Sequence, residues 1–89
     1  MRSDIEFARC LQRLSWDCRR GMKETEVLLT PFRETRFDTL DRAGQEAFLD
    51  LLDYSDADLF TWFTSTARPD DPAHAAMVEQ VLAHAAVGH

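Results

Sequence analysis

Histidine and cysteine side chains are the first places to look for chemistry in this sequence. His74 and His84 lie ten residues apart, which does not match the i, i+4 spacing of helical metal ligands, and His89 is the terminal residue. Cys10 and Cys18 lie eight residues apart in one helical pattern. Eight helical residues rise by about 12 Å, too far for a disulfide. We therefore expect no metal site and two reduced thiols.

Motifs of known catalytic chemistry are absent from the sequence. It contains no phosphate-binding loop, dinucleotide fingerprint, HExxH or nucleophile elbow. Asp53, Asp56 and Asp58 surround an expected helix start, where carboxylates favour the positive end of the helix dipole, and Asp70 and Asp71 have the same explanation. A small enzyme is therefore the least favoured class of function.

The stretch SWDCRRGMKETEVLL places Arg19, Arg20, Gly21 and Glu24 where one helical pattern ends and another begins. Gly21 is suited to ending a helix, because glycine takes a positive φ without strain. The arginines favour the negative end of the first helix dipole, and Glu24 favours the positive start of the next. A rigid turn that displays a guanidinium beside a carboxylate would also suit recognition of a partner. Residue types alone do not decide between these two roles.

Predicted helices position this junction. Ser3 and Glu6 form a capping box, and apolar residues at positions 7, 11, 14 and 18 form one stripe, which predicts a helix over about 4–19. A second helix begins near Met22. Its expected core residues are Val27, Leu28 and Leu29. Pro31 should end or kink this helix, since proline lacks the N–H that a helix interior needs.

The rest of the chain continues the helical pattern. Residues 31–40 form a short helical or irregular stretch that carries Phe32, Phe37 and Leu40 inward. Asp41, Ser55 and Asp71 are predicted to cap the next three helices, with Pro72 as the first residue of the last one. The expected core residues of these helices are Ala47, Phe48, Leu51, Leu52, Leu59, Phe60, Trp62, Phe63, Met77, Val81 and Ala85. So short a helix cannot hide all of Phe60, Trp62 and Phe63, and one of them is a candidate partner anchor. The last helix should span about 73–86.

Length and composition agree with this organisation. The 89 residues suit a single helical domain over 1–89, with 45% hydrophobic residues and only three glycines and three prolines. The predicted fold is all-α, a small bundle of about five short helices. A net charge of −6 disfavours nucleic acid and anionic membranes as partners. No apolar run approaches the length of a membrane span, and the charged N-terminus is unlike a signal peptide, so we expect a cytoplasmic protein without membrane insertion.

Several blocks of the sequence resemble one known family. WDCRRGMKETEVLLTPF contains an Arg-Gly-x-x-Glu motif at Arg20, Gly21 and Glu24, followed by Pro31 and Phe32, and DLFTWF forms a second matching block. The combination resembles the SdhE-type flavinator family, also called succinate dehydrogenase assembly factor 2, over about residues 7–81. The core motif shows no departure from the family pattern.

The resemblance implies a helper in covalent attachment of FAD to the flavoprotein subunit of succinate dehydrogenase, and in some members of fumarate reductase. It implies a location in the bacterial cytoplasm or the mitochondrial matrix. Arg20, Gly21 and Glu24 carry over as contacts to the flavoprotein; Trp16, Arg19 and Asp58 are weaker candidates. FAD is then the group attached to the partner. No tightly bound cofactor is expected, because no phosphate-cradling loop is present.

Two other functions stay open at this point. An acidic helical protein of this kind also fits an antitoxin that neutralises a small basic toxin, since relatives of the family have been labelled so. A generic helical adaptor, in which the Arg-Gly-x-x-Glu stretch is a mere junction, fits as well.

Overall fold

Five α-helices and one 3₁₀ turn make up the regular structure of residues 1–87, the part of the chain that this computed structural model describes. They are α1 (Asp4–Asp17), α2 (Lys23–Thr35), η1 (Phe37–Thr39), α3 (Arg42–Leu51), α4 (Asp56–Thr64) and α5 (Pro72–Ala86). No strand occurs within residues 1–87. The predicted all-α fold with about five short helices is confirmed. His89 lies outside the described residues.

Side-chain caps fix the starts of four helices. The Ser3 hydroxyl accepts from the backbone of Glu6, and the Glu6 carboxylate accepts in return from the Ser3 N–H, which completes the predicted capping box. Asp41, Ser55 and Asp71 cap α3, α4 and α5 as predicted. The start of α2 has no side-chain cap, so other contacts must hold the residues before it.

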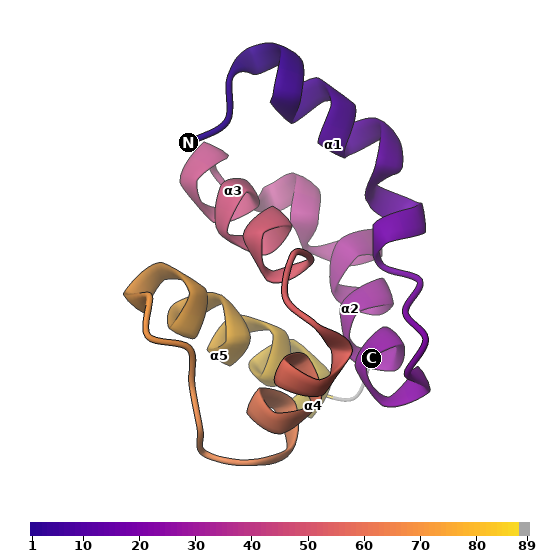
Figure 1. Cartoon of the computed structure of the whole chain (residues 1–89), viewed down its shortest axis with the longest axis vertical. Coiled ribbons are helices and arrows are strands. Elements are labelled where there is room, and N and C mark those ends of the chain that lie inside the picture. The colour runs from indigo at the N-terminus through magenta and orange to yellow at the C-terminus, as the bar shows by residue number, and fades with distance from the viewer. Residues whose placement is uncertain (88–89) are drawn as a thin grey trace.

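The α5 helix packs against three others, α2, α3 and α4 (Figure 1). α1 lies across one end of the molecule and packs on α3, whose other contacts are with η1 and α5. α2 packs against α4 and α5, and the connection from α1 to α2 runs along the outside of the molecule. None of the helices in the described chain is both long and apolar enough to cross a membrane.

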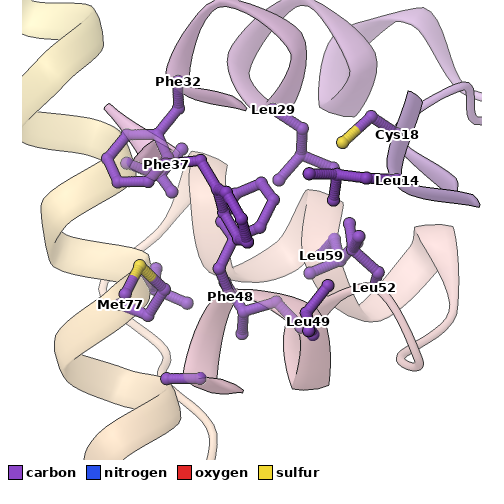
Figure 2. Close-up of a cluster of buried hydrophobic side chains, with 14 of the residues drawn as sticks. Leu14, Cys18, Leu29, Phe32, Phe37, Phe48, Leu49, Leu52, Leu59 and Met77 are labelled. Atoms are coloured by element: carbon purple, nitrogen blue, oxygen red, sulfur yellow. The ribbon is translucent and has the colours of Figure 1, made fainter. Parts of the chain in front are cut away.

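Aromatic rings form the centre of the core (Figure 2). Phe32 of α2 stacks on Phe48 of α3 with ring centroids 5.4 Å apart, and Phe37 meets the same ring edge-on at 5.6 Å. Leu14 and Cys18 of α1 are buried in the same cluster. Burial of the Cys18 thiol raises its pKa to about 11, so it stays protonated at neutral pH. Both cysteines carry free thiols, as expected.

The first helix ends earlier than predicted, and Gly21 does not end it. α1 stops at Asp17, with Cys18 as its C-cap in a right-handed conformation. The φ of Gly21 lies outside the left-handed region. The expectation of a positive φ at this glycine is therefore wrong: α1 ends at Cys18, whose N–H donates to the carbonyls of Leu14 and Trp16.

Pro31 does not end the second helix, which runs unbroken from Lys23 to Thr35. The missing N–H of Pro31 removes the helical partner of one carbonyl, that of Val27. Val27 is 59% exposed, so water can solvate that carbonyl. Leu29 and Phe32, both fully buried, hold the helix on the core on either side of the proline. The burial of Leu29 and Phe32 therefore outweighs the tendency of Pro31 to end the helix.

Four residues predicted to face the core lie on the surface instead. Leu11 is 42% exposed, and Val27, Phe60 and Ala85 are exposed as well. In α5 the buried position next to Ala85 is filled by His84, whose Nε2 lies 3.0 Å from Oγ1 of Thr35. Among the aromatic residues of α4, Phe60 is exposed while Phe63 is buried, which confirms that this helix cannot hide them all.

Candidate functional site

The Arg20 guanidinium ties the α1–α2 junction to the turn between α3 and α4. Its Nε–H donates to Oδ1 of Asp56 at 2.6 Å, and Nη2 donates to the Tyr54 carbonyl at 2.7 Å. Nη1 donates to the carbonyls of Leu52 and Asp17, at 2.9 and 3.1 Å. Those two carbonyls lie at the ends of α3 and α1, where helices have unpaired acceptors and a negative dipole end. One side chain therefore satisfies two helix ends and is itself only 13% exposed.

Asp56 completes this connection from the other side. It is the first residue of α4, and its Oδ2 accepts a hydrogen bond from the Gly21 N–H at 3.1 Å. A carboxylate at a helix start is favoured by the helix dipole. Through its two oxygens, Asp56 thus holds two consecutive residues of the junction, Arg20 and Gly21. From the sequence, Asp56 is expected to have only a dipole role, because nothing local links it to residues so far away in the chain.

Gly21 is exposed and is not required by the packing of this chain. A Cβ added there would lie 3.5 Å from Oδ2 of Asp56, which is an ordinary contact. If a side chain is not tolerated at position 21, the steric conflict must therefore be with a bound partner and not with this chain.

Glu24 faces solvent in the first turn of α2. Its carboxylate forms no hydrogen bond or ion pair with any residue between 1 and 87, while the next residue, Thr25, is fully buried and donates to the Met22 carbonyl at 2.8 Å. The motif is thus divided: Arg20 is turned inward as a structural clamp, and Glu24 is displayed. The Arg20 side chain is 13% exposed, and the role of Arg20 as a partner contact stays a prediction.

Trp16 and Arg19 supply the exposed part of the junction on the α1 side. The Trp16 side chain is 69% exposed, and the Arg19 guanidinium carbon lies 5.4 Å from the centroid of its ring, within cation–π range. Asp58 is exposed in the first turn of α4 and forms no ion pair with the junction among the described residues. Of the two arginines at the junction, Arg19 is therefore the exposed one.

A second polar network joins α3 to α5. The Tyr54 hydroxyl donates to Nδ1 of His74 at 2.8 Å, and Nε2–H of His74 donates to Oδ2 of Asp50 at 3.1 Å; this tautomer is the one that satisfies both contacts. The order of groups resembles a nucleophile–base–acid relay. Burial, together with the nearby carboxylates of Asp71 and Asp50, raises the pKa of Tyr54 and keeps it protonated. The network therefore ties α3 and the turn that follows it to α5.

Arg2 anchors the N-terminus to the same helix, α3. Its Nη1 lies 2.8 Å from Oε1 of Glu46 and 2.8 Å from Oδ1 of Asp50. Burial alone would raise the pKa of Glu46, but hydrogen bonds from Arg2 and Arg42 outweigh it and hold that pKa below its ordinary value. Within residues 1–87, no group of three or more His, Cys, Asp or Glu side chains could hold a metal ion.

The chain is similar to known proteins over most of its length. A family model described as "Flavinator of succinate dehydrogenase" matches residues 12–85. The chain is 49% identical over 72 residues to the FAD assembly factor SdhE of Photobacterium profundum, covering 81% of this chain and 82% of that protein. It is 46% identical over 72 residues to the same factor of Aliivibrio fischeri, covering 81% and 84%.

A solved structure has the same fold. The solution structure of a UPF0350 protein superposes with a TM-score of 0.72 at 38% identity, and the match covers 98% of this chain and 88% of that one. The matched region contains the whole clamp from Arg20 to Asp56 and the displayed Glu24. By sequence and by fold, the chain belongs to the family of succinate dehydrogenase flavinators.

Proposed function

We propose that this protein promotes covalent attachment of FAD to the flavoprotein subunit of succinate dehydrogenase, by binding that subunit rather than by turnover of its own. The observation that carries the proposal is the division of the Arg-Gly-x-x-Glu motif. Arg20 and Asp56 fix the junction from inside, while Glu24 keeps an unpaired carboxylate on the surface.

A fixed junction suits a helper of this kind. Covalent flavinylation is chemistry of the flavin and of the client's own side chain, so a helper contributes by orienting the client and by preorganised charge. A surface carboxylate on a loose turn would lose conformational freedom on binding, which weakens affinity. Four hydrogen bonds from Arg20 hold the turn before the client arrives.

The client contact in this proposal is made by Glu24, by the exposed backbone of Gly21 and, at the edges, by Trp16, Arg19 and Asp58. Arg20 acts from inside as a positioning residue. FAD is the group that becomes attached to the partner, and this chain holds none tightly. The proposal includes the flavoprotein subunit of fumarate reductase as a second client. It places the activity in the bacterial cytoplasm, like that of a chaperone acting before assembly.

The test is in-gel flavin fluorescence of the denatured flavoprotein subunit. Cells lacking the gene are compared with cells that regain wild type, Glu24→Ala or Asp38→Ala. Asp38 is a matched control, since it is an exposed carboxylate in η1, beyond the far end of α2. We expect covalent flavin to fall on deletion and to return with wild type and Asp38→Ala but not with Glu24→Ala. An unchanged flavin signal in the deletion strain would overturn the proposal.

A further inference from the structure

A groove runs between the C-terminal half of α1 and the outer face of α2. It has a volume of about 700 Å³ and is lined among others by Trp16, Arg19, Val27, Pro31 and Arg33. It is continuous with the displayed part of the junction. Glu24, Val27 and Pro31 follow one another at steps of three and four residues, which places them along one face of α2.

The lining of the groove is mixed: Trp16, Val27 and Pro31 are its apolar residues, and Glu26 and Glu34 line it beside the two arginines. Trp16 is 69% exposed and Val27 is 59% exposed. Neither side chain is needed in the hydrophobic core. Leu14 of α1 and Cys18, its C-cap, fill the core on that side, and Leu29 fills it on the side of α2. Exposed tryptophan beside other apolar side chains is typical of sites that bind another protein, where a large ring supplies contact area at a low cost in entropy.

The groove also contains an incompletely paired cation. The Nε of Arg33 is buried and has no hydrogen-bond partner within residues 1–87, although the Arg33 side chain is 25% exposed. Its nearest carboxylate is that of Glu34, 3.9 Å from Nη2, and Glu34 is itself 58% exposed. Cys18 lies close by but stays a neutral thiol and does not offset the charge. The guanidinium charge of Arg33 is therefore only weakly offset within residues 1–87, and the exposed part of the side chain can accept a further anionic partner.

We infer that this groove binds a segment of the flavoprotein client that places an apolar side chain between Trp16 and Val27 and a carboxylate on Arg33. The inference rests on the proposed function and names the chemistry of the segment that the client supplies. A carboxylate would pair with the exposed quarter of the Arg33 side chain, because the Nε itself is buried and closed to an incoming group. The chain's overall negative charge does not oppose this contact, since bulk charges are screened beyond about 10 Å while a buried pair is not.

The experiment measures binding of the purified client subunit, free of covalent flavin, to this protein. Trp16 is one of two tryptophans, so a Trp62→Phe background makes it the sole indole reporter. Its emission should shift to shorter wavelength when the client covers it. Calorimetry then gives Kd for Trp16→Ala and Arg33→Met, with Ile5→Ala as the matched control, because Ile5 is 68% exposed on α1 but does not line the groove.

We expect Trp16→Ala and Arg33→Met each to weaken Kd by about tenfold or more, as truncation of an interface hot spot does, and Ile5→Ala to leave it unchanged. Arg33→Met should also flatten the dependence of Kd on salt, because it removes one charged contact. Circular dichroism checks that each variant is folded. If Arg33→Met does not fold, Trp16→Ala still tests the inference, because Trp16 is exposed.

The other outcomes separate the inference from the proposed function. If both groove variants bind like wild type while Glu24→Ala binds weakly, the groove is not an interface and the proposed function survives. If Arg33→Met changes neither Kd nor the salt dependence of Kd, the bound client segment does not place a carboxylate on Arg33, and the inference fails. If Trp16→Ala abolishes only self-association, the occupant is a second copy of this chain. If wild type does not bind the client at all, both proposals fail.

Discussion

Asp56 lies 36 residues after Arg20 in the chain, yet one of its oxygens is 2.6 Å from the Arg20 Nε. The other oxygen holds the N–H of Gly21. This pair converts an irregular stretch between two helices into a fixed turn, and it explains how a motif of few residues can have both an internal and an external part. The arginine of the motif is hydrogen-bonded within the folded structure, whereas the glutamate faces solvent.

Asp56→Asn should loosen the junction without removing the helix cap of α4, which Ser55 provides. The substitution removes the charge beside a guanidinium that is only 13% exposed and replaces one acceptor oxygen by a donor. We expect a loss of about 1–3 kcal/mol in the free energy of unfolding, the range for a buried hydrogen-bonding group left unpaired. Urea denaturation measures this loss, and hydrogen exchange of the Gly21 amide should become faster.

Asp58→Asn is the matched control for that stability measurement. It makes the same substitution in the same helical turn. Because Asp58 is exposed, the free energy of unfolding should change by no more than about 0.5 kcal/mol. Equal stability of the two variants, with unchanged exchange at Gly21, would mean that the Arg20–Asp56 contact does not hold the junction.

Gly21→Ala and Gly21→Arg should separate the fold from the function. The alanine Cβ meets only an ordinary contact at 3.5 Å, and the backbone there is not left-handed, so Gly21→Ala should fold with nearly wild-type stability. Gly21→Arg should also fold, because Gly21 is exposed, but its long side chain would cover the client-facing backbone and abolish flavinylation. Thermal unfolding and in-gel flavin fluorescence of both variants check this. Restored flavinylation by Gly21→Arg would show that no partner approaches the glycine closely.

The features of this fold that depend on residues close together in the chain could be predicted from the sequence. Ser3, Asp41, Ser55 and Asp71 were recognisable as caps because a cap and the backbone N–H groups that donate to it are within three residues. Features that depend on the whole fold were missed. Pro31 breaks a helical hydrogen bond locally, yet the burial of its neighbours on the core keeps α2 continuous.

The candidate site shows the same limit. The resemblance to the family pointed to Arg20 and Glu24 together, and only the three-dimensional structure shows that one faces inward and the other outward. Val27 matched a core stripe by type and spacing, and its place in the groove follows from where α1 lies. Periodicity says that a helix has an apolar face; it does not say whether another helix covers that face fully.

Leu51→Ala should destabilise the whole fold. Leu51 is fully buried in α3, which contacts α1, η1 and α5, so truncation leaves a cavity that several helices share. The expected loss is about 2–5 kcal/mol in the free energy of unfolding. Leu11→Ala makes the same change at a position that is 42% exposed and should cost less than about 1 kcal/mol. Urea denaturation of the two variants provides the comparison; similar losses would contradict the burial pattern.

Glu46 should make stability depend on acid. Its side chain is only 6% exposed, and hydrogen bonds from Arg2 and Arg42 hold its pKa below the ordinary value of 4.5. A carboxylate with a lowered pKa in the folded state stabilises the protein above its unfolded pKa, and this contribution disappears as the pH falls through the folded value. Glu46→Gln should therefore be less stable than wild type at pH 7, and the gap should shrink below a pH of about 4.5. Urea denaturation from pH 7 to pH 3 measures the gap, with Glu79→Gln as the control, because Glu79 is 62% exposed in its pair with Arg68 and contributes little at any pH. A Glu46→Gln gap that stays constant across this range would show that the pairs with Arg2 and Arg42 do not stabilise the folded state through the Glu46 charge.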